Sequence, residues 1–364
     1  TLARILASRG HQVTWWSGTW SHRRKALRLL PPEIREDEGF SVRLVAMPPF
    51  AKDGSLAQLR SHADFGRTFE RLAGESVASG QLERPDIILA SLPPLESPEA
   101  ALRLGRRLDA TVVVDLVEAW PETFERLVPL PAFIRRLFSG LLFGGMHRRR
   151  AELLAAVDGV STTSRSLADA ALREAPADRP RHVCHLGAYV DEFPVAPRLV
   201  DAVPPVGGAA EAVATAAPIR CVYAGPLGPG EDLDTLVAAA RALSAAGTRA
   251  VLHVTGTGPL EPMLRAAAAT ARGSCGIEVH GPLPRADYAK LLGSCDVGLV
   301  LTKPETLAAV PAEACDSAAA GLALVSTLPG ELAELIETHA AGVSCPTGDP
   351  GALARAITAL AADR

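Results

Sequence analysis

Residues 219–236 read Ile-Arg-Cys-Val-Tyr-Ala-Gly-Pro-Leu-Gly-Pro-Gly-Glu-Asp-Leu-Asp-Thr-Leu, and the fold class follows from their pattern. The apolar run at 220–224 predicts a strand, the Gly- and Pro-rich residues 225–230 predict a turn, and the amphipathic stretch at 233–245 predicts a helix. A run that is apolar at nearly every position and is followed by a helix is typical of a parallel strand buried on both faces. This stretch therefore predicts one unit of a doubly wound α/β domain.

The same alternation of apolar runs and helical patterns occurs along the whole chain. Further strands are predicted at residues 13–16, 42–46, 87–90, 112–115, 160–163 and 182–185 and, after the stretch quoted above, at 251–255, 277–280, 297–301, 323–326 and 343–345. Between the two series, residues 197–218 are rich in Ala, Pro, Gly and Val and predict a linker. The sequence thus predicts an α/β protein with two Rossmann-like, doubly wound parallel-sheet domains, residues 1–196 and 219–364, and a cleft between them.

The composition excludes several classes of protein. The chain has 364 residues, of which 48% are hydrophobic and 21% charged, so it is an ordinary globular protein and not a disordered one. Its net charge of −4 argues against a nucleic-acid partner. Six cysteines lie far apart without a C-x-x-C pair, and the nine histidines show no ligand spacing, so neither a disulfide framework nor a metal site is predicted.

The cellular location is predicted from the same features. No stretch of 18 apolar residues is present, so no transmembrane helix is predicted. Arg4 and Arg9 interrupt the first apolar stretch, which argues against a secretory signal. Because the scattered cysteines are best explained as reduced thiols, we expect a cytoplasmic protein.

Two glycine-rich turns are candidates for binding a phosphate group. The turn at 225–228 lies between a predicted strand and a predicted helix, where backbone N–H groups form an anion site suited to a diphosphate. The turn at 255–259, Thr-Gly-Thr-Gly-Pro, is placed similarly, but Glu261 stands where a dinucleotide-binding loop has its third glycine. NAD is therefore not predicted there, whereas a tight turn and a turn that lets the backbone approach a nucleotide both stay open.

Two glutamates, Glu305 and Glu313, follow the predicted strand at 297–301 and are separated by seven residues. If a helix begins near Ala309, Glu313 lies on its first turn and Glu305 lies on the loop before it. Both carboxylates then face the carboxyl-terminal edge of the sheet, where ligands bind in open α/β folds. Carboxylates accept hydrogen bonds from sugar hydroxyls. On these residues alone, a solvated Glu and a helix-capping Glu explain the pair better.

The order of the motifs resembles the donor-binding domain of family 4 retaining glycosyltransferases, which have the two-domain GT-B fold. The E-x7-E motif of that family matches Glu305 and Glu313, and the helix that follows has similar small residues up to Gly321. Further matching segments lie at residues 9–13, 115–122, 186–191, 223–236, 255–259, 279–283, 288–300, 326–334 and 342–349. Residues 115–122, which contain Trp-Pro-Glu, resemble a segment of members that act on lipid-linked acceptors. The resemblance therefore covers nearly the whole chain.

The resemblance implies a retaining transferase of the hexosyltransferase type that needs no metal or other cofactor. Its partners would be a nucleoside diphosphate sugar and a glycan or lipid-linked acceptor, as in polysaccharide biosynthesis. The implied donor site consists of Gly225, Leu227, Gly228, Gly256, Gly258, Gly281, Thr306, Leu307 and Glu313, with Glu313 on the ribose and residues 225–228 near the diphosphate. Glu305, on the sugar hydroxyls, and Glu118, beside the position of a frequent acceptor-side histidine, are the catalytic candidates.

Two departures from the family leave other functions open. Pro226 and Glu231 stand where many members have an Arg and a Lys that contact the donor diphosphate, so cations are missing where the leaving group needs them. The alternatives are a sugar-nucleotide epimerase of the same fold and a catalytically inactive homologue that serves as a binding or scaffold subunit. The resemblance also implies that a first strand and a last helix are missing, so we expect both chain ends to be truncated.

Residues 131–150 predict a helix with an apolar face and many basic side chains. Apolar residues recur at helical spacing, and five arginines accompany them without an acid. An interfacial helix on anionic lipid has this composition, which would put the protein on the cytoplasmic face of a membrane. The membrane contacts would be Phe133, Phe138, Arg148, Arg149 and Arg150. Packing within the first domain explains the pattern equally well.

Overall fold

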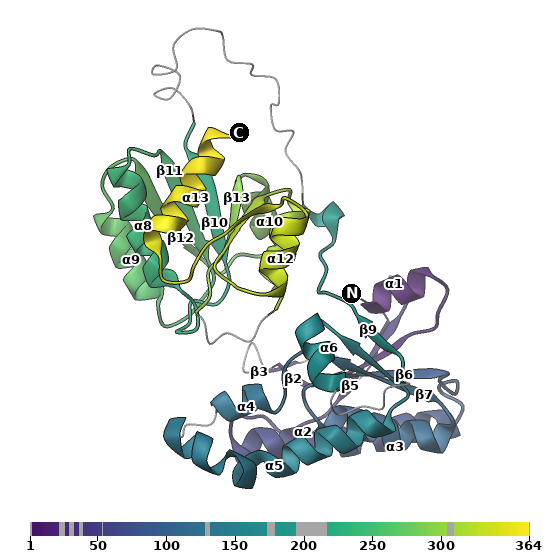
Figure 1. Ribbon diagram of the computed structural model, residues 1–364. Coiled ribbons are helices and arrows are strands. Elements are labelled where there is room, and N and C mark those ends of the chain that lie inside the picture. Colours follow the sequence, from purple (N-terminus) through teal and green to yellow (C-terminus); the bar gives the residue numbers. More distant parts are fainter. Residues whose placement is uncertain are drawn as a thin grey trace. The chain divides into compact units, whose positions relative to one another are not determined.

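The computed structural model describes residues 2–21, 26–28, 33–35, 39–52, 54–127, 132–172, 179–193, 217–303 and 309–363. They form two compact units, Thr1–Cys184 and His185–Arg364 (Figure 1). Each unit contains parallel strands with helices packed against them, so the predicted fold class of two Rossmann-like α/β domains is confirmed. None of the helices in these ranges combines the length and the hydropathy that spanning a bilayer requires.

The second unit contains a six-stranded parallel sheet in the order β12-β11-β10-β13-β14-β15. Its strands are β10 (Ile219–Ala224), β11 (Ala250–Thr255), β12 (Cys275–Gly281), β13 (Val297–Val300), β14 (Ala323–Ser326) and β15 (Gly342–Ser344). The chain runs outward from β10 to β12 and then returns to add β13 on the other side of β10. The carboxyl ends of β10 and β13 therefore form the topological switch point, where open α/β sheets bind their ligands.

The helices of the second unit are α8 (Leu233–Ala245), α9 (Glu261–Thr270), α10 (Arg285–Gly293), α11 (Ala312–Ala319), α12 (Glu331–Thr338) and α13 (Pro350–Ala362) (Figure 1). The largest core cluster joins β10, β11 and β12 to α8, α9 and α13. In α8, Leu233, Leu236 and Leu243 recur on one face and are fully buried, which explains why this stretch forms a helix against the sheet. Two smaller clusters contain residues of α10 and of α11 and α12.

The first unit contains a four-stranded parallel sheet of β6 (Ile87–Leu92), β7 (Thr111–Leu116), β8 (Gly159–Thr162) and β9 (Arg181–Val183), in that order. β1 (Thr14–Gly18) pairs in parallel with β5 (Ser41–Val45), and β4 (Glu33–Arg35) is antiparallel to β5. β2 (Trp20–Ser21) and β3 (Ala26–Leu27) form a short antiparallel pair. The helices are α1 (Leu2–Ser8), α2 (Leu56–Ala78), α3 (Glu96–Leu108), α4 (Glu122–Leu127), α5 (Ala132–Ala156) and α6 (Arg165–Leu172). The core joins β6, β7 and β8 to α2, α3 and α5.

Every strand that the sequence predicts is present, with ends within two residues of the prediction. Three further strands, β2, β3 and β4, were not predicted from the sequence and have only two or three residues each. Strands this short contain too few residues for an alternating pattern to be recognised. The apolar runs therefore identified the buried parallel strands and left out the short antiparallel additions of the first unit.

The division between the units lies after Cys184, earlier than the predicted end of the first domain at residue 196. Side-chain contacts explain the difference, because the segment that follows is bound to the second unit. Nε2 of His185 lies 2.6 Å from a carboxylate oxygen of Glu331, and the guanidinium of Arg285 pairs with Glu192 at 2.8 Å. Of the predicted linker, residues 197–216 lie outside the described residues.

Candidate active site

Backbone hydrogen bonds connect the turn after β10 to the segment after β13. The amide of Asp232 donates to the carbonyl oxygen of Leu301 at 3.2 Å. The amide of Lys303 donates to the carbonyl oxygen of Gly230 at 2.9 Å. The glycine-rich turn thus lies directly beside the start of the connection to α11. Residues 304–308 of that connection lie outside the described part of the chain, and with them the predicted site residues Glu305, Thr306 and Leu307.

Glu313 lies on the first turn of α11 and close to the glycine-rich turn. A Cβ atom added to Gly225 would lie 3.0 Å from the hydroxyl oxygen of Tyr223 and 3.7 Å from Oε1 of Glu313, so little space separates the three residues. Burial raises the pKa of Glu313, and the charge of Asp316 adds to this effect. The fold therefore brings together Gly225 and Glu313, which are far apart in the sequence.

A second acid, Glu231, completes this cluster. Burial raises the pKa of Glu231 to about 6, and the charge of Glu313 acts in the same direction. The hydroxyl of Tyr223 donates to the carbonyl oxygen of Pro226 at 2.8 Å and also contacts Glu231. That contact acts against the rise in the pKa of Glu231, because a hydroxyl that donates to a carboxylate favours its charged form. In the sequence, Glu231 stands out only as a departure from a family pattern. Tyr223 gives no signal there, because it lies in an apolar strand.

The backbone of the turn corrects part of the predicted diphosphate site. The amide of Gly225 donates to the carbonyl oxygen of Thr255 at 3.1 Å, and the amide of Leu227 donates to that of Thr257 at 2.9 Å. The side chain of Leu227 is fully buried. These two amides bind the neighbouring turn, so they do not point at a ligand. Within the described ranges the amide of Gly228 has no hydrogen-bond partner, which makes it the donor of the three that stays available.

The glycines of the second turn have a structural role. Gly256 has a φ of 144°, and a Cβ there would lie 1.8 Å from the carbonyl oxygen of Gly225. A Cβ on Gly258 would lie 2.3 Å from the carbonyl oxygen of Leu227. The carbonyl oxygen of Gly281, which has a φ of 71°, accepts the amide of Gly256 at 3.1 Å. Close packing of the two turns thus requires Gly256 and Gly258, independently of any nucleotide.

In the first unit, Glu118 lies in the loop after β7 and is exposed. Asp115, near the end of β7, is a further acid at the same edge of that sheet. Burial raises the pKa of Asp115, and its hydrogen bond with Ser161 of β8 acts against this shift. The loop is held by Thr163, whose hydroxyl donates to the carbonyl oxygen of Val117 at 3.1 Å. Asp115 is not among the site residues predicted from the sequence, although it is an acid at the end of an apolar run.

Two of the three arginines predicted to contact a membrane are bound inside the first unit. The guanidinium of Arg149 donates two hydrogen bonds of 2.7 Å to Glu99 and one of 3.1 Å to Glu96, both on α3. Arg150 is 8% exposed and pairs with Glu122 at 2.7 Å. The expectation that they contact lipid is therefore corrected: their charges are matched by acids that lie far away in the sequence.

The rest of the predicted membrane contact is only partly described. Arg148 is exposed and lies 3.8 Å from Glu152. Phe133 and Phe138 belong to α5, and their side chains lie outside the described part of the structure. Leu142 is 49% exposed on the same helix. Among the described side chains of α5, Arg148 and Leu142 are thus exposed, whereas Arg149 and Arg150 are paired with acids of the first unit.

Residues 218–363 match the family model described as glycosyl transferases group 1. The match spans most of the second unit and less than half of the chain, and it includes both glycine-rich turns, Glu231 and Glu313. No curated protein matches the sequence.

Several solved structures resemble the chain at low sequence identity. Sucrose-phosphate synthase from Thermosynechococcus elongatus has a TM-score of 0.66 and 16% identity, over 100% of this chain and 82% of the other. UDP-forming α,α-trehalose-phosphate synthase from Burkholderia xenovorans has a TM-score of 0.61 and 14% identity, over 99% and 90%. HepE from Anabaena, in complex with UDP-glucose, has a TM-score of 0.56 and 15% identity, over 88% and 76%. The chain therefore has the GT-B fold, and its second unit is a glycosyltransferase group 1 domain.

Proposed function

We propose that the protein is a retaining glycosyltransferase of the hexosyltransferase type that moves a sugar from a nucleoside diphosphate sugar to a glycan or lipid-linked acceptor. The observation that carries the proposal is the family match of residues 218–363, because these residues include the switch point at the ends of β10 and β13. A complex of the structurally similar HepE with UDP-glucose supports a UDP-sugar as the donor. In the transfer, the bond from the anomeric carbon to the diphosphate breaks, a bond to an acceptor oxygen forms on the same face, and the acceptor hydroxyl loses its proton.

The donor would lie over the glycine-rich turn. Glu313 would accept hydrogen bonds from the ribose hydroxyls, since a carboxylate is an acceptor and its side chain lies beside Gly225. The unpartnered amide of Gly228 would donate to the diphosphate, and Lys303, bonded through its backbone to Gly230, would bring a cation close to it. Glu305, with the backbone of Thr306 and Leu307, would contact the sugar.

The remaining glycines would support the donor site from behind. Gly256, Gly258 and Gly281 hold the second turn against the first, so they would shape the site by packing. No metal or cofactor is needed in this scheme, because protein donors would stabilise the leaving diphosphate. Few donors would be available for this, since Pro226 and Glu231 occupy positions where the family that the sequence resembles has cations.

The acceptor would be bound by the first unit. Glu118 and Asp115 lie at the carboxyl end of β7, where an acceptor hydroxyl could lose its proton to a carboxylate. The half-buried Asp115, with its raised pKa, and the exposed Glu118 are different candidates for this base. Variants of each residue distinguish the two candidates, because substitution of the base should lower turnover without weakening donor binding.

A lipid-linked acceptor also requires contact with the cytoplasmic face of a membrane, and α5 would provide it through Arg148 and Leu142. One cation near an anionic surface contributes about 1 kcal/mol, so the attachment would be weak and sensitive to salt. We expect the protein to sediment with anionic liposomes at low salt, and Arg148→Glu to reduce this. Arg84→Glu, which changes another exposed arginine of the first unit, is the control. Equal sedimentation of all three proteins would contradict membrane contact through α5.

A catalytically inactive binding protein is the second candidate, and the acidic pair Glu231 and Glu313 favours it. Labelled nucleotide sugars, supplied with and without a membrane lipid extract, separate the candidates. Acceptor-dependent transfer of the label with retained anomeric configuration supports the proposed function. Binding without turnover supports the inactive protein, and isomerisation of the sugar without acceptor would identify an epimerase. Absence of nucleotide-sugar binding in a folded sample would overturn the proposal.

A further inference from the structure

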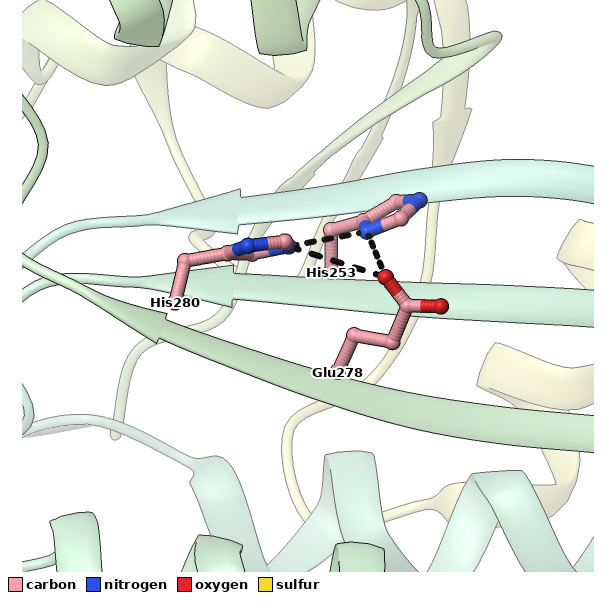
Figure 2. Close-up of side chains that lie close together, drawn as sticks. All are labelled: His253, Glu278 and His280. Carbon is pink, nitrogen blue, oxygen red and sulfur yellow. Dashed lines mark hydrogen bonds and ion pairs between the residues drawn. The ribbon is translucent and has the colours of Figure 1, made fainter.

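Three side chains from neighbouring strands of the second unit point toward one another: His253 of β11 and Glu278 and His280 of β12 (Figure 2). Nδ1 of His253 lies 3.0 Å from Nε2 of His280 and 3.2 Å from Oε2 of Glu278. The same oxygen of Glu278 lies 3.9 Å from Nε2 of His280. Two nitrogen atoms and one oxygen atom, each with a lone pair to offer, therefore meet at one place.

The register of the sheet explains this convergence. His253 and Glu278 are directly paired across β11 and β12. The pairing shifts by one residue between Val254 and Thr255, which leaves His280 as the additional residue on β12. His280 follows Glu278 by two residues, so the alternation of side chains along β12 places both on the same side of the sheet.

We propose that His253, Glu278 and His280 bind one divalent transition-metal ion, for which Zn²⁺ fits best. Imidazole nitrogens and carboxylate oxygens are zinc ligands at about 2.0–2.2 Å. Two ligand atoms at that distance, with angles of about 90–110° at the metal, lie roughly 2.8–3.6 Å apart. The separations of 3.0 and 3.2 Å fall in this range, and a small rotation of the exposed Glu278 brings the third, 3.9 Å, into it.

Burial makes one ligand rigid and leaves the other two accessible. His253 is 2% exposed, so its ring is fixed by the surrounding side chains. The side chains of Glu278 and His280 are 56% and 29% exposed, because β12 is the edge strand of the sheet. An ion can therefore enter from solvent, and three protein ligands leave a coordination position for water or an added ligand.

A metal ion also satisfies the cluster better than protons do. A hydrogen between the two imidazoles engages only one pair of atoms, whereas an ion binds all three lone pairs at once. Arg220 on β10 acts electrostatically on His253 and opposes a cation, and the carboxylate of Glu278 offsets that charge. Among the described residues, no other group of three or more His, Cys, Asp or Glu side chains has ligand atoms close enough to share an ion. The histidines are too far apart in the sequence for a motif to reveal them.

The proposal is tested with Zn²⁺ on the full chain, prepared without a histidine tag and titrated in a calorimeter. We expect the wild-type protein to bind one ion. His280→Ala and Glu278→Gln should weaken zinc binding by at least about tenfold. Removing a residue that only hydrogen-bonds to a metal ligand already costs about that much affinity, and these variants remove a ligand itself. Both side chains are partly exposed, so the variants should stay folded. Zn²⁺ should raise the Tm of the wild-type protein and not that of His280→Ala.

Two control variants exclude binding elsewhere. His339→Ala removes an exposed histidine of the same unit, and Cys184→Ser removes an exposed thiol; neither should change the affinity for zinc. Bound Co²⁺ should show no thiolate-to-metal charge-transfer band, since no cysteine takes part. The proposal is refuted if the wild-type protein does not bind zinc, if His280→Ala and Glu278→Gln bind it as the wild type does, or if Cys184→Ser abolishes binding. These outcomes do not depend on the proposed transferase activity.

Discussion

Replacing Glu231 with Gln tests the charge arrangement at the end of β10. Burial raises the pKa of Glu231 from 4.5 to about 6, so the folded protein holds this proton more tightly than the unfolded chain does. The protonated carboxyl therefore contributes stability that is complete below about pH 4.5 and is lost as the pH rises through about 6. A neutral Gln has no charge to desolvate, so the variant should keep that stability at every pH.

The size of the effect follows from the pKa. The pKa of Glu231 rises from 4.5 to about 6, and each tenfold change in the acid dissociation constant corresponds to about 1.36 kcal/mol. The rise therefore corresponds to roughly 2 kcal/mol. Glu231 keeps some contact with solvent, so we expect Glu231→Gln to raise the free energy of unfolding by about 1–2 kcal/mol at pH 8. The two proteins should have nearly equal stability at pH 4.

The chain allows this to be measured for each unit separately. All four tryptophans, at positions 15, 16, 20 and 120, lie in the first unit, and all three tyrosines, at 189, 223 and 288, lie in the second. Urea unfolding followed by tyrosine near-ultraviolet dichroism should show the stabilisation, and tryptophan fluorescence should not. Asp234→Asn, which changes an exposed acid on the first turn of α8, is the control. A difference between variant and wild type that does not change with pH would refute the argument, because Glu231 would then ionise normally.

Three further substitutions test the site and its framework. Glu313→Ala should weaken binding of UDP-glucose by about 1.5–3 kcal/mol in a calorimetric titration, the contribution of a charge-assisted hydrogen bond, and unchanged affinity would remove Glu313 from the site. Gly256→Ala should destabilise the second unit by about 1–3 kcal/mol or more, seen as a lower Tm, because its Cβ would meet the carbonyl oxygen of Gly225. Arg150→Met should cost the first unit roughly 1.5–3 kcal/mol through the lost bond to Glu122; wild-type stability in urea would mean that this pair contributes nothing.

The sequence predicted the parallel strands well and the side-chain networks poorly, for one physical reason. The burial of a strand is evident from its own residues, since a run such as Val297–Val300 must be apolar to lie between two layers of helices. The partners of a charged side chain cannot be identified from the residues next to it in the sequence. Arg149 lies 50 residues from Glu99, so helical spacing could place it on a basic face but could not find the acid that neutralises it. The interfacial-helix hypothesis was weakened for that reason.

The glycine turns illustrate a different limit. Both were selected because glycine lets a backbone approach a phosphate, but Gly256 and Gly258 approach another segment of backbone instead. A glycine in the sequence indicates a close approach without saying what approaches. The hydrogen bond from the amide of Gly225 to Thr255 shows that the first turn packs on the second. It follows from the parallel register of β10 and β11 and is visible only in the folded chain.

The ionisation of Glu231 also separates an active enzyme from a binding protein. A departing diphosphate needs positive charge or hydrogen-bond donors, and Glu231 can donate only while it is protonated, below about pH 6. Above that pH its charge would repel a diphosphate bound at the glycine-rich turn, as in the proposed donor site; two like charges about 5 Å apart repel by roughly 1–3 kcal/mol at dielectric constants between 80 and 20. In an active enzyme, Glu231→Gln should therefore raise both UDP-glucose affinity and kcat at pH 8, with little change at pH 5. In a binding protein only the affinity should rise. An affinity that is independent of pH in the wild-type protein would place the diphosphate elsewhere, because UDP-glucose keeps its own charge over this range.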